Sequence, residues 1–342
     1  MRKLTCTRCG QRVFFENTRC ESCSAALGFV PMELTMAAFE VAAGGEWRRH
    51  GAEDSAESAQ WPCANYLNEQ VCNWMVPAGS EETLCLSCRS TEMLPPLDVP
   101  PNRERWAALE QAKRRLFYGL LAMGLPLDGL SFRFLADLPD GAPEAHPLTG
   151  HNHGVITINV AEADDSTREA TRAQMNESYR TLLGHFRHEA GHFYWEKLID
   201  GTPWLDEFRR QFGDEQTDYQ QALQQHYNMP VADWWQRFIS AYASSHPWED
   251  WAECWAHYMH LHDGLETAAA WGLRLAGVEP QPLDPDEPLQ RPLIEEWLPV
   301  SQFVNAMDRS LGTADSYPFV VPPPVVEKLQ FIHRVIAAQP PP

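Results

Sequence analysis

The sequence predicts an α+β protein in which a mainly helical domain with a small β-sheet follows one or two small cysteine-rich modules. The chain of 342 residues mixes 44% hydrophobic with 22% charged residues, as globular domains do, and it is longer than one ordinary domain. Eight of its nine cysteines fall between residues 6 and 88. Beyond them, apolar residues recur mostly at helical spacing, and two segments alternate or cluster as strands do.

The N-terminal cysteines form two sets of four. Cys6-x-x-Cys9 and Cys20-x-x-Cys23 each offer two thiolates from one tight turn, which suits a tetrahedral zinc ion. In the second set, the first two cysteines lack the CxxC spacing, so this set is a less specific signal for zinc. It consists of Cys63, Cys72, Cys85 and Cys88. We expect one or two structural zinc ions, in a ribbon over residues 1–28 and a ribbon-like module over residues 59–94.

These cysteine modules have more than one possible role. They either stabilise segments that are too small to build a core or dock a substrate or protein partner. A redox role is disfavoured, because the CxxC units are paired and no βαβ pattern lies beside them. Cys254 is left over, and we expect it to be a small buried hydrophobic residue on a helix.

A proline-rich linker over residues 95–102 is the predicted boundary before the helical domain, because four prolines there cannot continue a helix. Residues 29–58, rich in alanine, glycine and charge, are expected to form a linker or an extension. The domain over residues 103–338 should open with a helix that Asn102 caps. Its helical spacing is carried by Trp106, Leu109, Ala112, Leu116 and Leu120. Strands are expected at residues 131–135 and 154–160, and a last helix after the prolines at 322–324.

The charge and hydropathy of the chain exclude several classes of protein. A formal net charge of −20 repels polyanions, and the lysines and arginines are scattered, so we expect no nucleic-acid partner. No apolar run reaches roughly 18 residues. No apolar region follows the first basic residues, so we expect a cytoplasmic protein that does not span a membrane.

One short motif carries most of the chemistry. His188-Glu189-x-x-His192 lies in an apolar segment, residues 182–195, that has the pattern of a helix. The two histidines are one turn apart on one face and can bind one zinc ion. Glu189 follows the first directly, where it can accept a proton from water at the metal. Gly191 is costly in mid-helix, so we expect another element to approach it closely.

The third ligand must come from elsewhere in the chain. A metzincin has glycine and a third histidine at the positions that Trp195 and Leu198 occupy here, so this class is excluded. A gluzincin takes its third ligand from a carboxylate on a later helix. Pro247 indicates the start of such a helix.

On this second helix, Glu249 and Glu253 lie four residues apart on one face, and Ala252 and Ala256 leave room for close packing. We predict that Glu249 binds zinc and that Glu253 holds the imidazole of a ligating histidine, or that these two roles are exchanged. Tyr242 precedes the helix closely enough to stabilise an oxyanion at the metal, although a core tyrosine would also fit the pattern.

These motifs resemble known families. The pattern Tyr242-x6-Glu249-x-x-Ala252-Glu253 resembles that of the gluzincin domain of anthrax lethal factor, which implies a catalytic tyrosine and a zinc-binding first glutamate. A resemblance over almost the whole chain is to the bacterial zinc-binding metallopeptidases that carry an N-terminal zinc ribbon. It rests on residues 183–192, 156–159, 162–165 and 246–253. This resemblance implies a zincin-like domain with one catalytic zinc ion.

We therefore predict a zinc-dependent peptidase that acts on a peptide or protein substrate, with Glu189 as general base. One alternative is a zinc-ribbon adaptor whose second domain only binds peptides; another is a zinc isopeptidase or amidohydrolase using the same residues. A protein partner could dock through the ribbons. His151 and His153 could line the cleft, because the strand after them typically forms a substrate-binding edge in zincins.

Overall fold

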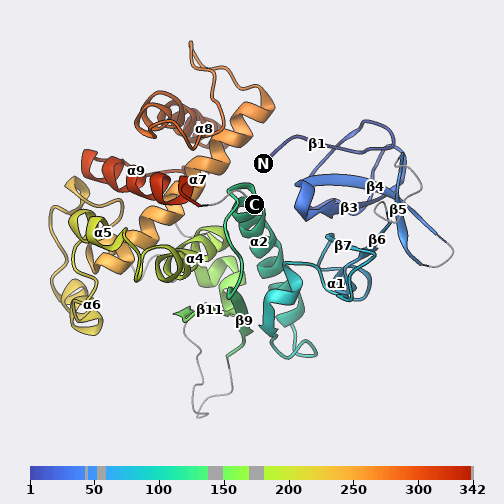
Figure 1. The fold of residues 1–342 in the computed structure, drawn as a ribbon, viewed down its shortest axis with the longest axis horizontal. Coiled ribbons are helices and arrows are strands. Elements are labelled where there is room, and N and C mark those ends of the chain that lie inside the picture. The colour runs from blue at the N-terminus through green and yellow to red at the C-terminus, as the bar shows by residue number, and fades with distance from the viewer. Residues whose placement is uncertain (43–44, 52–58, 138–148, 169–180, 340–342) are drawn as a thin grey trace. The chain divides into compact units, whose positions relative to one another are not determined.

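The computed structural model describes residues 1–42, 45–51, 59–137, 149–168 and 181–339. These residues form two compact units (Figure 1). We call them the ribbon unit, residues 2–149 and 157–163, and the helical unit, residue 1 with residues 150–156 and 164–342. The mixture of helices with several small sheets confirms the predicted α+β class.

The ribbon unit begins with a short antiparallel pair, β1 (Leu4–Thr5) and β2 (Arg12–Val13). A five-stranded antiparallel sheet follows, with its strands in chain order. The strands are β3 (Ala26–Val30), β4 (Thr35–Val41), β5 (Trp47–Arg49), β6 (Ala59–Pro62) and β7 (Met75–Pro77). Short helices in this unit are η1 (Pro31–Glu33), α1 (Ala64–Leu67) and η3 (Cys88–Ser90).

This sheet corrects the expectation of a linker or extension over residues 29–58, where β3 ends and β4 and β5 lie. Residues 43–44 and 52–58 of that stretch lie outside the described residues. Val30, Ala37, Phe39 and Met75 form a small buried core. Alanines weaken the β-strand signal of a sequence, but their small side chains fit between closely packed strands, as Ala37 does with no exposed surface.

Helix α2 (Asn102–Ala122) belongs to the ribbon unit, so the proline run before it is not the division between the two units. Asn102 is the first helical residue and Pro101 holds the cap position, which corrects the predicted cap by one residue. The Asn102 amide donates to the Pro96 carbonyl at 3.0 Å. All five apolar residues predicted for its inner face are buried.

A four-stranded sheet has the order β10-β11-β9-β8 and includes both predicted strands. Its strands are β8 (Thr91–Met93), β9 (Ser131–Leu135), β10 (Gly150–Asn152) and β11 (Val155–Asn159), with η4 (Val160–Ala163) following. β8 and β9 are parallel. Because β10 and β9 flank β11, β11 is not an edge strand, which corrects that part of the zincin expectation.

The helical unit is built around two long helices, α4 (Leu182–Leu198) and α7 (Pro247–Trp271). Other helices are α5 (Leu205–Phe212), α6 (Tyr219–Asn228), α8 (Leu298–Leu311) and α9 (Pro323–Ala337). Short 3-10 helices are η5 (Trp234–Gln236) and η6 (Tyr242–Ser244), and η7 (Pro292–Trp297) is a π-helix. The stacked rings of Phe208 and Phe212 meet Trp251 at centroid distances of 6.0 and 5.7 Å. Among the described residues, no helix combines the length and apolarity needed to cross a bilayer.

Candidate functional site

The site begins where α4 and α7 cross. At Gly191 an added Cβ would lie 2.9 Å from the Ala252 Cα and 3.1 Å from the Trp255 Cβ. The indole of Trp251 donates to the Gly191 carbonyl at 2.8 Å. The predicted close approach at this glycine is therefore confirmed, and it brings the motif on α4 against the first turns of α7.

Capping residues set where both helices begin. Thr181 caps α4 by accepting from the Gly184 amide at 3.0 Å. His246 caps α7, with Nδ1 accepting from the Trp248 amide at 3.1 Å and Pro247 in the first turn, as predicted. This start places Glu249 in the first turn of α7, where a carboxylate is favoured by the helix dipole.

His188, His192 and Glu249 converge at the crossing. The Glu249 Oε2 lies 3.0 Å from the His188 Nε2 and 3.5 Å from the His192 Nε2. One ligand atom from each of the three residues lies within 4.8 Å of the others. Glu249 is 1% exposed, so its carboxylate is removed from water. Two imidazole nitrogens and one carboxylate oxygen form a donor set that zinc prefers.

The charge and the hydrogen bonds of the Glu249 carboxylate suit a bound cation. The Glu249 Oε2 is buried and has no hydrogen-bond partner among the described residues. Burial alone would raise the pKa of Glu249, but His192 and His188 outweigh it and hold the pKa well below its usual value. A buried, ionised and incompletely paired carboxylate is costly, and a bound cation removes that cost.

Glu253 and Glu249 occupy different places, which distinguishes the two carboxylates. The His188 Nδ1 donates to the Glu253 Oε1 at 2.7 Å, on the far side of the ring from Glu249. The second Glu253 oxygen accepts from the Ser240 hydroxyl at 2.7 Å. Glu253 thus orients an imidazole, whereas Glu249 faces both histidines. This geometry favours the predicted order of roles over the exchanged one.

Glu189 lies on α4 next to His185. The His185 Nε2 is 3.2 Å from the Glu189 Oε1, one turn earlier on the same helix face. Burial raises the pKa of Glu189, but the contact with His185 and the nearby His188 outweigh it and lower the pKa overall. Glu189 is therefore ionised at neutral pH, as a proton acceptor must be.

Two tyrosines and two further rings surround the cluster. Tyr242 lies with its ring centroid 6.0 Å from that of His188. Burial and the Glu249 charge raise its pKa, so it remains a hydrogen-bond donor. Tyr219 donates to the Glu249 Oε1 at 2.6 Å. The rings of Trp248 and His151 lie 3.9 and 6.2 Å from that of His192, between centroids.

Each cysteine set also comes together. The Cys6 and Cys23 sulfurs are 3.7 Å apart, and those of Cys9 and Cys20 are 3.6 Å apart. Four sulfurs at about 2.3 Å from one zinc ion would be about 3.8 Å from each other, so these distances fit a tetrahedral site. The first set includes the exposed Cys9.

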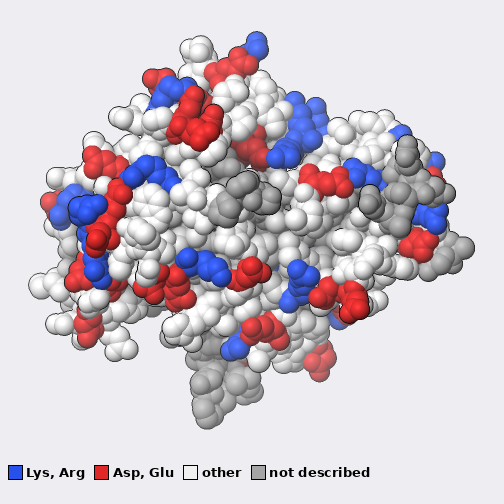
Figure 2. Space-filling model, viewed as in Figure 1, with Lys and Arg blue, Asp and Glu red and all other residues white. Residues whose placement is uncertain are grey.

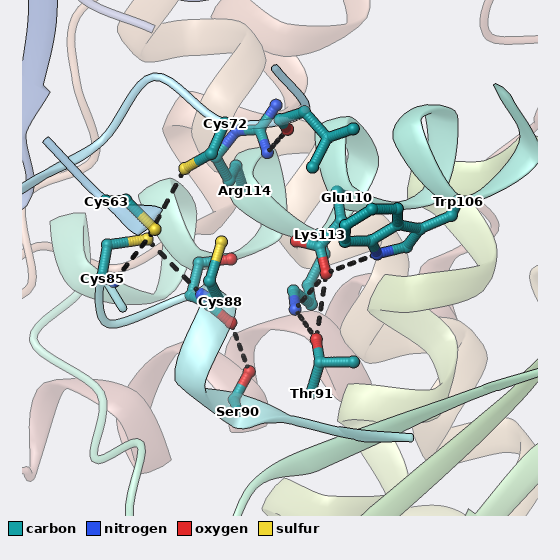
Figure 3. A network of polar contacts seen from close by, with 12 residues as sticks. Cys63, Cys72, Cys85, Cys88, Ser90, Thr91, Trp106, Glu110, Lys113 and Arg114 are labelled. Atoms are coloured by element: carbon teal, nitrogen blue, oxygen red, sulfur yellow. Dashed lines mark hydrogen bonds and ion pairs between the residues drawn. The ribbon is translucent and has the colours of Figure 1, made fainter. Parts of the chain in front are cut away.

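The second set is entirely buried, with a Cys72–Cys85 sulfur separation of 3.7 Å. The fold brings these four cysteines together although their spacing in the sequence is irregular. Figure 3 shows polar side chains of α2 next to it. Arg114 donates to the Val71 carbonyl at 2.6 Å, directly before Cys72. Lys113 donates to Glu110 at 2.9 Å and also to Thr91, three residues after Cys88.

The family whose model is described as "Putative zinc-binding metallo-peptidase" matches residues 102–335. The chain belongs to this family. A zinc-ribbon domain model matches residues 3–99. The chain is 41% identical over 351 aligned positions to the uncharacterized proteins Rv2568c of Mycobacterium tuberculosis and Mb2598c of Mycobacterium bovis. The alignment covers 98% of this chain and 95% of either relative. No solved structure gives a significant match.

The family and the two cysteine sites support zinc binding by this chain. Sequence reasoning missed Tyr219, Ser240 and the role of His185. Only His185 had a signal, since it precedes Glu189 by four residues. Two histidines further along α7 have contacts of their own: His257 contacts the Tyr317 hydroxyl at 2.9 Å, and His262 contacts Asp263 at 3.1 Å.

Proposed function

We propose that this metallo-peptidase is a zinc-dependent hydrolase of peptide bonds of the HExxH gluzincin type. The observation that carries the proposal is the convergence of His188, His192 and Glu249, with a buried carboxylate oxygen that has no hydrogen-bond partner. These three residues would hold one catalytic zinc ion. The ion, when bound, supplies a Lewis acid that polarises the scissile carbonyl and makes water more acidic.

The residues of the chain perform the proton transfers. Glu189 accepts a proton from the attacking water as the oxygen bonds to the carbonyl carbon, and passes a proton to the leaving amine as the C–N bond breaks. The hydroxyl of Tyr242 donates to the oxyanion that forms on the former carbonyl oxygen. Glu253 keeps His188 in one orientation through its 2.7 Å hydrogen bond.

The substrate is a peptide or protein chain. Lys and Arg side chains lie interspersed with Asp and Glu over the face that Figure 2 shows. Together with the net charge of −20, this distribution favours neutral or basic peptides over polyanions such as nucleic acid. We further propose that the ribbons stabilise their own unit and offer a surface to a protein partner.

Zinc content per chain is the first test. We expect about three zinc ions in the native protein, with one lost in His188→Ala and another lost in Cys6→Ser. Glu189→Gln should keep the zinc ion and lose turnover of a peptide library, because only the proton acceptor is removed. Two ions that are unaffected by His188→Ala would refute the catalytic site and support the adaptor alternative.

Two rival functions use the same fold. An adaptor would have no physical need for Glu189, whose ionised carboxylate lies beside the two histidines. An isopeptidase or amidohydrolase would use the same residues on a side-chain amide. Peptides that carry a lysine isopeptide bond, assayed beside linear peptides, separate this activity from cleavage of the main chain.

A further inference from the structure

Tyr219, the first residue of α6, reaches the carboxylate that faces both histidines. Its hydroxyl donates to the Glu249 Oε1 at 2.6 Å. The Oε2 of the same carboxylate is left facing His188 and His192 at 3.0 and 3.5 Å. One oxygen is thus occupied by a protein donor, and the other is directed to the place where a cation would lie.

The chain segment before Tyr219 is attached to the start of α7. The His246 Nδ1 accepts from the Trp248 amide, so the ring proton is on Nε2, which donates to the Thr217 carbonyl at 3.0 Å. At Gly213, whose φ is +109°, an added Cβ would lie 3.1 Å from the Pro247 side chain. The same turn that begins α7 therefore also positions the residues leading to Tyr219.

Helix α6 itself lies at the surface. None of its ten residues is buried. Asp218 caps it by accepting from the Gln221 amide at 2.8 Å. Beyond Tyr219, a ring contact joins His226 to Tyr242, with centroids 6.3 Å apart. The hydroxyl of Tyr219 thus links this exposed helix to the candidate metal site.

We propose that Tyr219 is a positioning residue that holds Glu249 with a single oxygen toward the metal. This inference rests on the proposed function. A hydrogen bond to the outer oxygen of a ligating carboxylate fixes the orientation of the carboxylate and lowers the entropy lost when the metal binds. Removing such a supporting hydrogen bond typically weakens metal affinity by about ten- to a hundredfold.

The test is zinc affinity in the full chain with Tyr219→Phe, which removes only the hydroxyl. Zinc-loaded protein is equilibrated with graded concentrations of a chelator, and the retained zinc is counted per chain. The ion that His188→Ala lacks identifies the site. We expect the zinc dissociation constant at this site to rise about ten- to a hundredfold. The control Tyr227→Phe, on the same helix with 58% of the side chain exposed, should change it less than about twofold.

A double-mutant cycle separates positioning from a general effect on the fold. If Tyr219 acts through Glu249, Tyr219→Phe should have no further effect in a Glu249→Ala background. An equal loss in both backgrounds, or wild-type affinity in Tyr219→Phe, would overturn the positioning role while the proposed function stands. If the wild type holds no zinc beyond the cysteine sites, both proposals fail together.

Discussion

Replacing Gly191 by alanine tests the helix crossing on which the candidate site depends. The added Cβ would lie 2.9 Å from the Ala252 Cα, whereas ordinary contacts begin near 3.4 Å, so α4 and α7 must separate by about half an ångström. The neighbouring atoms are backbone and the Trp255 Cβ, which cannot rotate away. Alanine favours a helix over glycine by about 1 kcal/mol. Overpacking costs about 1–3 kcal/mol, so the free energy of unfolding of the variant should be lower by about 1 kcal/mol net.

The same separation should weaken zinc binding, because the two histidines and Glu249 belong to different helices. We expect the thermal midpoint to fall by about 2–4 °C for a unit of this size, and zinc affinity to fall on the order of tenfold. Unfolding is followed by circular dichroism, and zinc affinity by chelator competition. Gly79→Ala is the control, since an added Cβ there meets nothing within 4 Å. A Gly191→Ala protein that gains stability and keeps its zinc affinity would refute the close approach.

Three further predictions concern buried charge, pH and the cysteine sites. Lys328 donates to Asp250 at 2.5 Å in the interior, so Lys328→Met should lower the free energy of unfolding in urea by about 3–5 kcal/mol. Adding Asp250→Asn should recover much of this loss, and no recovery would count against the pairing. Burial lowers the pKa of His257 to about 4 from 6.5, so the folded protein holds this imidazole neutral where the unfolded chain would protonate it. The contribution of His257 to the free energy of unfolding is therefore present above pH 6.5, and it decreases by about 2 kcal/mol between pH 7 and pH 5. His257→Gln should flatten this part of the pH–stability profile, and an unchanged profile would contradict the assignment. Cys72→Ser should lower the thermal midpoint more than Cys9→Ser, because the sulfur of Cys72 is buried and that of Cys9 is exposed; equal shifts would oppose this.

Features that depend on local spacing could be predicted from the amino-acid sequence. The four-residue period of His188 and His192 requires one helix face, Pro247 predicts the start of α7, and Gly191 signals a close contact in mid-helix. Because helical geometry follows from chain spacing alone, these features could be predicted without a fold. The membership of the chain in a zinc-binding metallo-peptidase family was expected from the resemblance of its motifs, at residues 183–192 and 246–253 above all, to that family.

Contacts between residues that are far apart in the chain depend on the folded structure and could not be predicted. The fold directed Glu249 toward both histidines and Glu253 toward the outer nitrogen of His188, although both carboxylates share one face of α7. It also brought Tyr219 to Glu249 from 30 residues away. The strands over residues 26–49 were missed for a related reason. Alanine-rich strands are stabilised by packing against their neighbours, and this packing has no periodic trace in the sequence.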